Sequence, residues 1–236
     1  MDIQLYYRER GRGETLILLH GNGEDGSYFS HQIEFFSHRY RVIAVDTRGH
    51  GNSPRGTAPF TMEQFAEDVA SFMEEHGIAD ATVLGFSDGA NIAMKLALQH
   101  PKKVNALILN GGNLHPKGVK RTVQIPIEIG YRIAKIFAKR SAEAKKNEEM
   151  LGLMVKEPMI NPKELGAIKV PVLVLCGTRD MIKRSHSETI AKSVEGARIS
   201  FIKGNHFIAN QEPTAFNVAV DRFLESIPRT GRASLE

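Results

Sequence analysis

The sequence has 236 residues, of which 42% are hydrophobic and 25% charged, and its formal net charge is +4. This balance is typical of a globular chain with a large core, and it excludes disordered and fibrous proteins. The mildly basic charge does not predict a nucleic-acid partner, because the sequence contains no recognisable nucleic-acid-binding module and no aromatic stacking platform.

The N-terminal segment is polar, and no apolar run approaches the length that crosses a bilayer. We therefore expect a cytoplasmic protein without a membrane partner. The single cysteine, Cys176, lies in an apolar run and is expected to be a buried strand residue. No metal-ligand spacing and no phosphate-binding glycine loop is present, so neither a metal nor another cofactor is predicted. Residues 229–236 are expected to form a disordered tail.

Short apolar runs rich in β-branched residues alternate with stretches of helical periodicity. This pattern is typical of an α/β fold, in which crossover helices cover both faces of a mostly parallel sheet. The predicted strands cover residues 3–8, 15–19, 41–46, 81–85, 104–109, 170–176 and 198–202. The predicted helices cover residues 27–37, 61–76, 88–99, 185–194 and 213–226.

One connection is much longer than a single helix requires. Residues 112–167 interrupt the alternation, so we expect a helical insertion there, between the core segments 1–111 and 168–228. A chain that leaves and re-enters the sheet at this point emerges at the carboxyl edge of the strands. The insertion is therefore predicted to be a lid.

The insertion contains an amphipathic pattern from Pro126 onward, with the proline in the first helical turn. Ile129, Ile133, Ile136 and Phe137 form an apolar face that we expect to be buried over the pocket mouth. Two alternatives are that this face packs on the core away from the pocket, or that a basic stripe beside it binds a membrane weakly.

The most informative motif is Gly-Phe-Ser-Asp-Gly at residues 85–89, between a predicted strand and a predicted helix. A serine on such a sharp turn needs unusual backbone angles and close packing, which explains the flanking glycines. Ser87 is therefore the candidate nucleophile. Serine is a weak nucleophile unless a base accepts its proton and an acid orients that base.

The later sequence supplies both groups. Asp180 follows the strand at 170–176, and His206 follows the strand at 198–202. Both lie at the carboxyl ends of predicted strands, which is the edge where open α/β sheets bind ligands. Ser87, Asp180 and His206 are therefore the predicted catalytic triad.

Together with the segments at 20–23 (His-Gly-Asn-Gly) and 46–53 (Asp-Thr-Arg-Gly-His-Gly-Asn-Ser), these motifs resemble the α/β-hydrolase superfamily over nearly the whole chain. The resemblance implies an oxyanion hole made by the backbone N–H groups of Asn22 and Asp88. It also implies structural roles for His20, His50 and Asp46. Some relatives place the acid after the strand at 104–109, where this sequence has Asn110.

The Ser-Asp-Gly elbow is similar to that of biphenyl-hydrolase-like and valacyclovirase-type members. Phe86 beside the nucleophile, with Ile133 and Phe137 of the insertion, is predicted to line the substrate pocket. The expected reaction is hydrolysis of a small carboxylic ester through an acyl-enzyme. Thioester, lactone, aminoacyl-ester and carbon–carbon hydrolysis are alternatives on the same triad, and a ligand-binding receptor without catalysis is an alternative of another class.

Overall fold

The computed structural model describes residues 2–227, so the tail predicted at 229–236 lies outside the described residues. One seven-stranded sheet has the order β1-β3-β2-β4-β5-β6-β7. β1 is antiparallel to β3, and every other neighbouring pair is parallel. The strands are β1 (Tyr7–Arg10), β2 (Glu14–Leu19), β3 (Tyr40–Val45), β4 (Ala81–Phe86), β5 (Val104–Asn110), β6 (Val172–Gly177) and β7 (Arg198–Ile202). The predicted α/β fold is confirmed.

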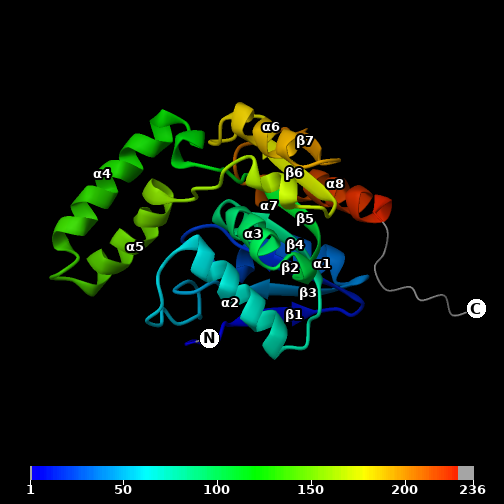
Figure 1. Ribbon diagram of the computed structural model, residues 1–236, viewed down its shortest axis with the longest axis horizontal. Coiled ribbons are helices and arrows are strands. Elements are labelled where there is room, and N and C mark those ends of the chain that lie inside the picture. The colour runs from blue at the N-terminus through cyan, green and yellow to red at the C-terminus, as the bar shows by residue number, and fades with distance from the viewer. Residues whose placement is uncertain (1, 228–236) are drawn as a thin grey trace, which may run out of the picture.

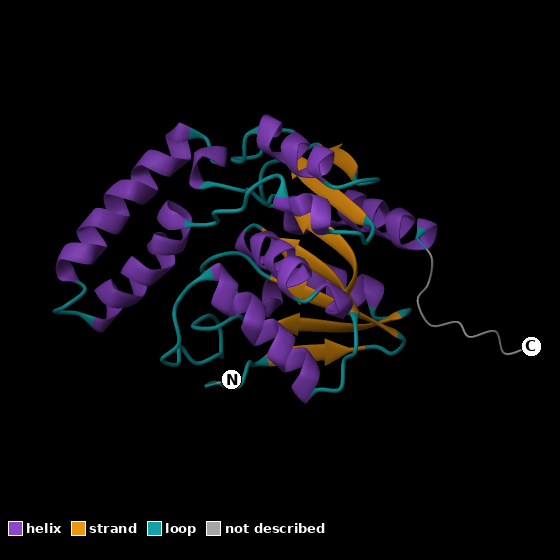
Figure 2. Cartoon of the chain, viewed as in Figure 1, coloured by secondary structure: helices purple, strands orange, loops and turns teal. Residues whose placement is uncertain are grey.

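Helices cover both faces of the sheet (Figures 1 and 2). The helices are α1 (Ser30–Phe36), α2 (Met62–Glu75), α3 (Asp88–Gln99), α4 (Arg121–Phe137), α5 (Ala142–Lys156), α6 (Arg184–Ser193), α7 (Ile208–Gln211) and α8 (Pro213–Ser226). Apolar side chains of α2, α3 and α6 form the core on one face, and those of α1 and α8 form the core on the other. Because both faces are covered, β4 and β6 are buried along their whole length. Within residues 2–227, no helix is long and apolar enough to cross a membrane.

The first strand begins later than predicted. Residues 3–8 were expected to pair, but β1 starts at Tyr7. Ile3 and Leu5 are nevertheless buried. Alternating apolar residues therefore marked an extended segment that packs on the core, whereas backbone pairing with β3 begins only after it.

The chain between β5 and β6 forms a helical hairpin of α4 and α5, which projects from the sheet (Figure 1). α4 begins at Arg121, so Pro126 lies inside the helix and not in its first turn as predicted. Proline removes one backbone hydrogen bond from a helix interior. The helix continues past this point, and its buried residues Gln124, Tyr131 and Ala134 lie on the side that packs on α5.

The apolar face of α4 is not buried, contrary to the prediction. Ile129, Ile133, Ile136 and Phe137 are 52%, 52%, 71% and 49% exposed. The periodicity correctly marked an apolar stripe, but periodicity does not identify the surface that a stripe meets. α4 packs on α5 through a different side, so Ile133 and Phe137 face outward and do not cover a pocket mouth.

Candidate active site

The candidate nucleophile lies on a strained turn between β4 and α3. Ser87 has φ 53° and ψ −116°, and it is the only non-glycine residue within 2–227 with a positive φ. Such a conformation persists only where the surrounding structure holds it. Here the Ser87 amide donates to the Asn110 carbonyl oxygen (2.8 Å), and the Ser87 carbonyl oxygen accepts from the amides of Ala90 and Asn91.

The glycines on either side of Ser87 are required by close packing. A Cβ atom at Gly85 would collide with the Gly89 carbonyl oxygen, and one at Gly89 would collide with the Leu19 carbonyl oxygen. The motif at 85–89 therefore lets α3 approach β2 and β4 closely enough to present Ser87 at the end of the sheet.

The three predicted triad side chains meet at this edge. The Nε2 atom of His206 lies 3.0 Å from the Ser87 Oγ atom. On the other side of the ring, Nδ1 lies 2.7 Å from the Asp180 Oδ1 atom. Ser87, Asp180 and His206 follow β4, β6 and β7, so parallel strands bring together residues that are far apart in the sequence.

Asp180 is held in its ionised form. Burial opposes ionisation, but the hydrogen bond and charge of His206 outweigh it, so the pKa of Asp180 is lowered. The Ile182 amide also donates to Oδ1, at 2.9 Å. An ionised carboxylate at Nδ1 holds the proton on that nitrogen and leaves Nε2 free to accept the proton of Ser87.

The two expected oxyanion-hole residues flank Ser87 and are joined by their side chains. Asp88 is the first residue of α3, where a backbone N–H has no intrahelical acceptor. The Asn22 amide donates to no protein acceptor within the described part of the chain. The Asn22 Nδ2 atom donates both to the Asp88 Oδ2 atom (3.0 Å) and to the Met150 carbonyl oxygen of α5 (2.8 Å). One amide group thus fixes the two donor-bearing segments to each other and to the hairpin.

We expect Asn22→Ala to lower kcat by at least about tenfold, because the two backbone donors would lose their shared support. KM and the melting temperature should change little, because Asn22 is only partly buried. The matched control is Asn217→Ala, which removes a buried amide bonded to Gln32 between α8 and α1. This control should lose stability and keep its kcat. Equal kcat losses in both variants would contradict the positioning role.

Two further carboxylates lie beside the triad. The Asp88 side chain is buried, and burial raises its pKa to about 6 against the opposing hydrogen bond from Asn22. Burial raises the pKa of Glu24 to about 7, although its Oε2 atom accepts from the Gly21 amide at 3.2 Å. Neither carboxylate forms an ion pair with a lysine or arginine among residues 2–227. Within residues 2–227, no ion pair therefore neutralises these two carboxylates.

The raised pKa of Glu24 predicts a pH-dependent stability. Between about pH 4.5 and pH 7 the folded chain binds more protons than the unfolded chain, so the free energy of unfolding falls as the pH rises. Glu24→Gln should reduce that fall by about 1–2 kcal/mol, allowing for partial solvent access. Urea unfolding at pH 4.5 and pH 8 measures the change in the free energy of unfolding. Glu195→Gln, at an exposed site, is the control. An unchanged pH dependence in Glu24→Gln would contradict this assignment.

Aromatic rings pack around the histidine. The Phe86 ring lies 4.8 Å from the His206 ring and stacks on Tyr28 at 4.4 Å. Phe207 lies 5.6 Å from His206 and is partly exposed. Of the predicted pocket residues, Phe86 is therefore next to the triad, whereas Ile133 and Phe137 lie on the outer side of the hairpin.

His20, His50 and Asp46, for which the resemblance implies structural roles, have hydrogen-bond partners in the loops that follow β2 and β3. His20 Nε2 accepts from the Thr47 amide at 3.0 Å, and burial lowers its pKa. Asp46 accepts from the amides of Gly26 and Asn52, which closes the turn after β3. Among residues 2–227, no group of three or more His, Cys, Asp or Glu side chains is arranged to hold a metal ion.

Sequence reasoning missed the side-chain role of Asn22, the Met150 carbonyl and Glu24. Asn22 was identified only through its backbone N–H. Glu24 lies in the loop that follows the His-Gly pair, so its place in the sequence could have indicated an acid near the site. A backbone carbonyl in the middle of α5 leaves no signal in the sequence.

Both the sequence and the fold of the chain match known proteins. Residues 14–130 match the family model of the alpha/beta hydrolase fold. The chain is 28% identical to a putative carbamate hydrolase, RutD, of Azorhizobium caulinodans, over 92% of this chain and 93% of the relative. It is 24% identical to 3-oxoadipate enol-lactonase 2 of Acinetobacter baylyi, over 95% of this chain and 94% of the relative.

Among solved structures, the enol-lactonase of Burkholderia xenovorans LB400 superposes with a TM-score of 0.80 at 24% identity. The superposition covers 95% of this chain and 97% of that structure. The chain belongs to the α/β-hydrolase superfamily. It is a hydrolase of this fold, like the relatives with which it aligns.

Proposed function

We propose that the chain hydrolyses small carboxylic esters through an acyl-enzyme, with Ser87 as nucleophile, His206 as base and Asp180 as orienting acid. The observation that carries the proposal is the continuous hydrogen-bonded path from Asp180 through His206 to a strained Ser87. The relatives support hydrolysis at a carbonyl carbon, since their names specify carbamate and lactone substrates.

In the first half-reaction, Ser87 Oγ forms a bond to the ester carbonyl carbon while its proton moves to His206 Nε2. The carbonyl oxygen becomes an oxyanion, which the backbone N–H groups of Asn22 and Asp88 stabilise by hydrogen bonding. The C–O bond to the alcohol then breaks, and His206 returns the proton to the departing oxygen. Asp180 remains ionised throughout and stabilises the imidazolium.

In the second half-reaction, His206 removes a proton from water, which attacks the acyl carbon. The bond to Ser87 Oγ then breaks, and Oγ recovers its proton. The same steps open a lactone, cleave a thioester or, with a carbon leaving group, split a carbon–carbon bond, so the pocket decides among these substrates.

A panel of p-nitrophenyl esters from acetate to octanoate, together with simple lactones, tests the proposal. We expect steady turnover of at least one ester and an initial burst of one p-nitrophenol per chain where deacylation is slow. Binding of esters without turnover would favour the receptor alternative. Turnover of lactones alone would replace the ester assignment and leave the triad in place.

Aminoacyl esters are a second candidate, favoured by the two carboxylates beside the triad. Asp88 and Glu24 lie close to His206 and form no ion pair among residues 2–227, so the field there favours a cationic group over an anionic one. An α-ammonium group on the acyl part could pair with a carboxylate in a poorly hydrated site.

Paired substrates distinguish this candidate. At pH 7.5, kcat/KM for an alanine ester should exceed that for the isosteric isobutyrate ester by about tenfold or more, corresponding to about 1.4 kcal/mol. Asp88→Asn should remove the preference and retain turnover of the neutral ester. Equal rates in the wild-type protein would reject the aminoacyl assignment, and faster turnover of an anionic ester would contradict the acidic field.

A further inference from the structure

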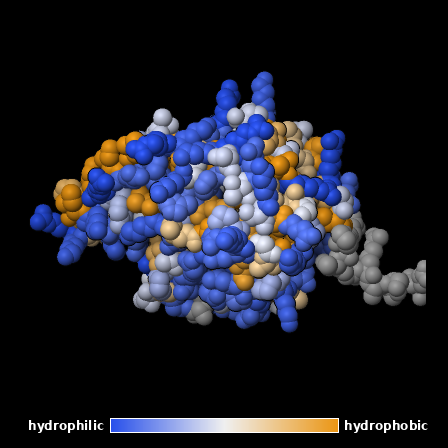
Figure 3. Space-filling model, turned by 45° about the horizontal axis from the view of Figure 1, so that its top comes forward, coloured by the Kyte–Doolittle hydropathy of each residue, from blue (hydrophilic) through white to orange (hydrophobic). Residues whose placement is uncertain are grey.

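The outer side of the hairpin carries the most exposed apolar surface along any helix within residues 2–227. We call it the α4 face, and it consists of Ile125, Ile129, Ile133, Ile136 and Phe137. Each of these side chains is between 41% and 71% exposed. Ile125, Ile129 and Ile133 are four residues apart, and Ile136 and Phe137 follow Ile133 by three and four residues, which places all five on one stripe of α4. Figure 3 shows apolar surface gathered on this part of the molecule.

A row of cations borders the α4 face. Arg121, Arg132, Lys135 and Lys139 lie beside the stripe at helical spacing, and all four are exposed. None of them forms an ion pair within the described chain. Elsewhere on the surface, lysines and arginines commonly form ion pairs with acids. The row on α4 differs from them in carrying positive charge without such pairs.

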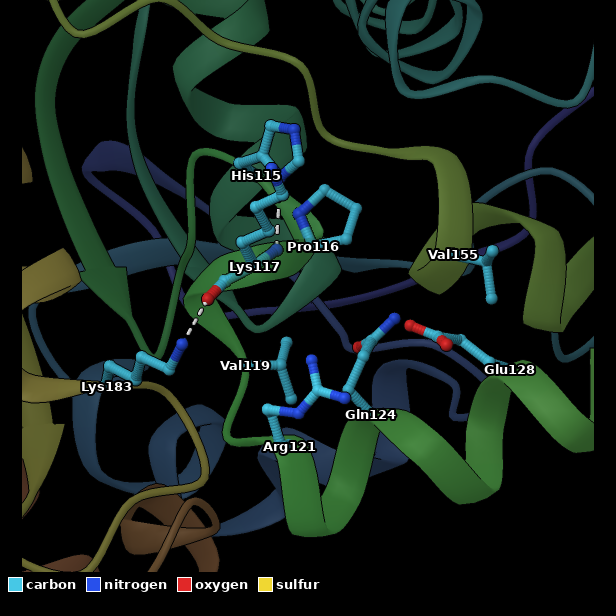
Figure 4. Close-up of a pocket in the computed structure, with 9 residues that line it drawn as sticks. All are labelled: His115, Pro116, Lys117, Val119, Arg121, Gln124, Glu128, Val155 and Lys183. Carbon is cyan, nitrogen blue, oxygen red and sulfur yellow. Dashed lines mark hydrogen bonds between the residues drawn. The ribbon is translucent and has the colours of Figure 1, made fainter.

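The one acid on this side of α4, Glu128, lines a pocket together with Arg121. Glu128 is half-buried and lines a pocket of ≈ 380 Å³ at the base of the hairpin. Figure 4 shows its carboxylate directed toward Gln124, with Arg121 on the other side of Gln124. Arg132, Lys135 and Lys139 therefore present positive charge that no ion pair within residues 2–227 neutralises.

We propose that the α4 face is a docking surface for anionic lipid membranes, with the helix lying in the plane of the interface. Apolar side chains enter the boundary between headgroups and acyl chains, while the flanking arginines and lysines contact anionic headgroups. The apolar stripe and the flanking cations are both present on one helix, and either of them alone would bind a bilayer only weakly. The inference differs from the sequence-based expectation of no membrane partner, because the sequence placed this face over the pocket.

Charge complementarity favours a lipid surface over a second copy of the chain. An antiparallel pair of α4 helices related by a twofold axis would place each basic flank against the same flank of its partner. Four cations would then face four cations across the contact, with Glu128 as the one acid that each helix contributes on that side. An anionic membrane neutralises all of them at once.

The hairpin connects the α4 face to the active site. α5 packs under α4, and its Met150 carbonyl oxygen accepts from Asn22 beside the nucleophile. A membrane held by α4 is thus on the side of the molecule where the insertion borders the catalytic edge. Esters carried in the bilayer would be presented near that edge, but docking itself does not depend on which ester is cleaved.

Vesicle sedimentation tests the proposal directly. The full chain is mixed with vesicles of pure phosphatidylcholine or of phosphatidylcholine with about 30 mol% phosphatidylglycerol. We expect at least about tenfold stronger partitioning to the anionic vesicles, and a large loss of it at about 0.5 M salt. The double variant Ile129→Glu/Ile136→Glu should lower partitioning at least about tenfold, and Arg132→Gln/Lys135→Gln should lower it only on anionic vesicles.

The matched control is Phe35→Glu, which changes an exposed apolar residue of α1. It should bind vesicles like the wild-type protein. Turnover of soluble p-nitrophenyl acetate should be the same in all these variants, which separates loss of docking from loss of folding or of the proposed esterase activity. Absence of binding to anionic vesicles, or binding that the α4 variants leave unchanged, would overturn the proposal. The face would instead bind a second copy of the chain if the protein formed a concentration-dependent dimer, did not bind vesicles, and became monomeric in the Ile129→Glu/Ile136→Glu variant.

Discussion

Ser87→Ala is expected to lower kcat for p-nitrophenyl esters by about 10⁵- to 10⁶-fold without unfolding the chain, as removal of the nucleophile does in other serine hydrolases. The Oγ atom is the group at the elbow to which His206 Nε2 is hydrogen-bonded, so its removal takes away the nucleophile that the base would activate. Turnover is measured alongside circular dichroism. Ser185→Ala, at an exposed site on α6, serves as the control and should retain full activity. Normal turnover in the Ser87→Ala variant would exclude the acyl-enzyme mechanism.

Asp180→Asn is expected to reduce kcat by about 10⁴-fold, and His206→Ala by a comparable or larger factor. An asparagine amide at position 180 can donate to Nδ1, which would put the ring proton on Nε2 and block acceptance from Ser87. Because Asp180 is ionised and its pKa is lowered, its own titration does not limit activity near neutral pH. kcat/KM should still fall on acidification, since protonated His206 cannot act as a base.

The control for the acid is Asp80→Asn, which changes an exposed aspartate at the amino end of β4, the end opposite Ser87, and should retain normal rates. The pH profile of the wild-type protein completes the test. If Asp180→Asn kept near-normal turnover, another carboxylate would have to orient His206, and Glu24 and Asp88 would be the residues to change next.

The sheet and the candidate triad could be predicted because both depend on local sequence. Runs buried on both faces mark parallel strands, and a motif that directly follows such a run lies at the carboxyl edge. Ser87, Asp180 and His206 each follow a strand in this way. The order of β4, β6 and β7 in the sheet then brings the loops that carry them to the same edge.

The features that the sequence did not reveal depend on tertiary partners. The helical period of α4 showed an apolar stripe, but which side would pack on α5 depends on a second helix whose own pattern is weakly amphipathic. The bond between Asn22 and the Met150 carbonyl joins residues far apart in the chain through a backbone atom. The raised pKa values of Glu24 and Asp88 arise from burial, which charge patterns alone do not report.

The central claim is that Ser87 is activated by His206 and forms a covalent intermediate. Labelling with a fluorophosphonate, followed by intact-mass measurement and peptide mapping, tests it most directly. We expect one label per chain on Ser87, much slower labelling in His206→Ala and none in Ser87→Ala. Labelling of another residue, or an unlabelled wild-type chain that still hydrolyses esters, would contradict it.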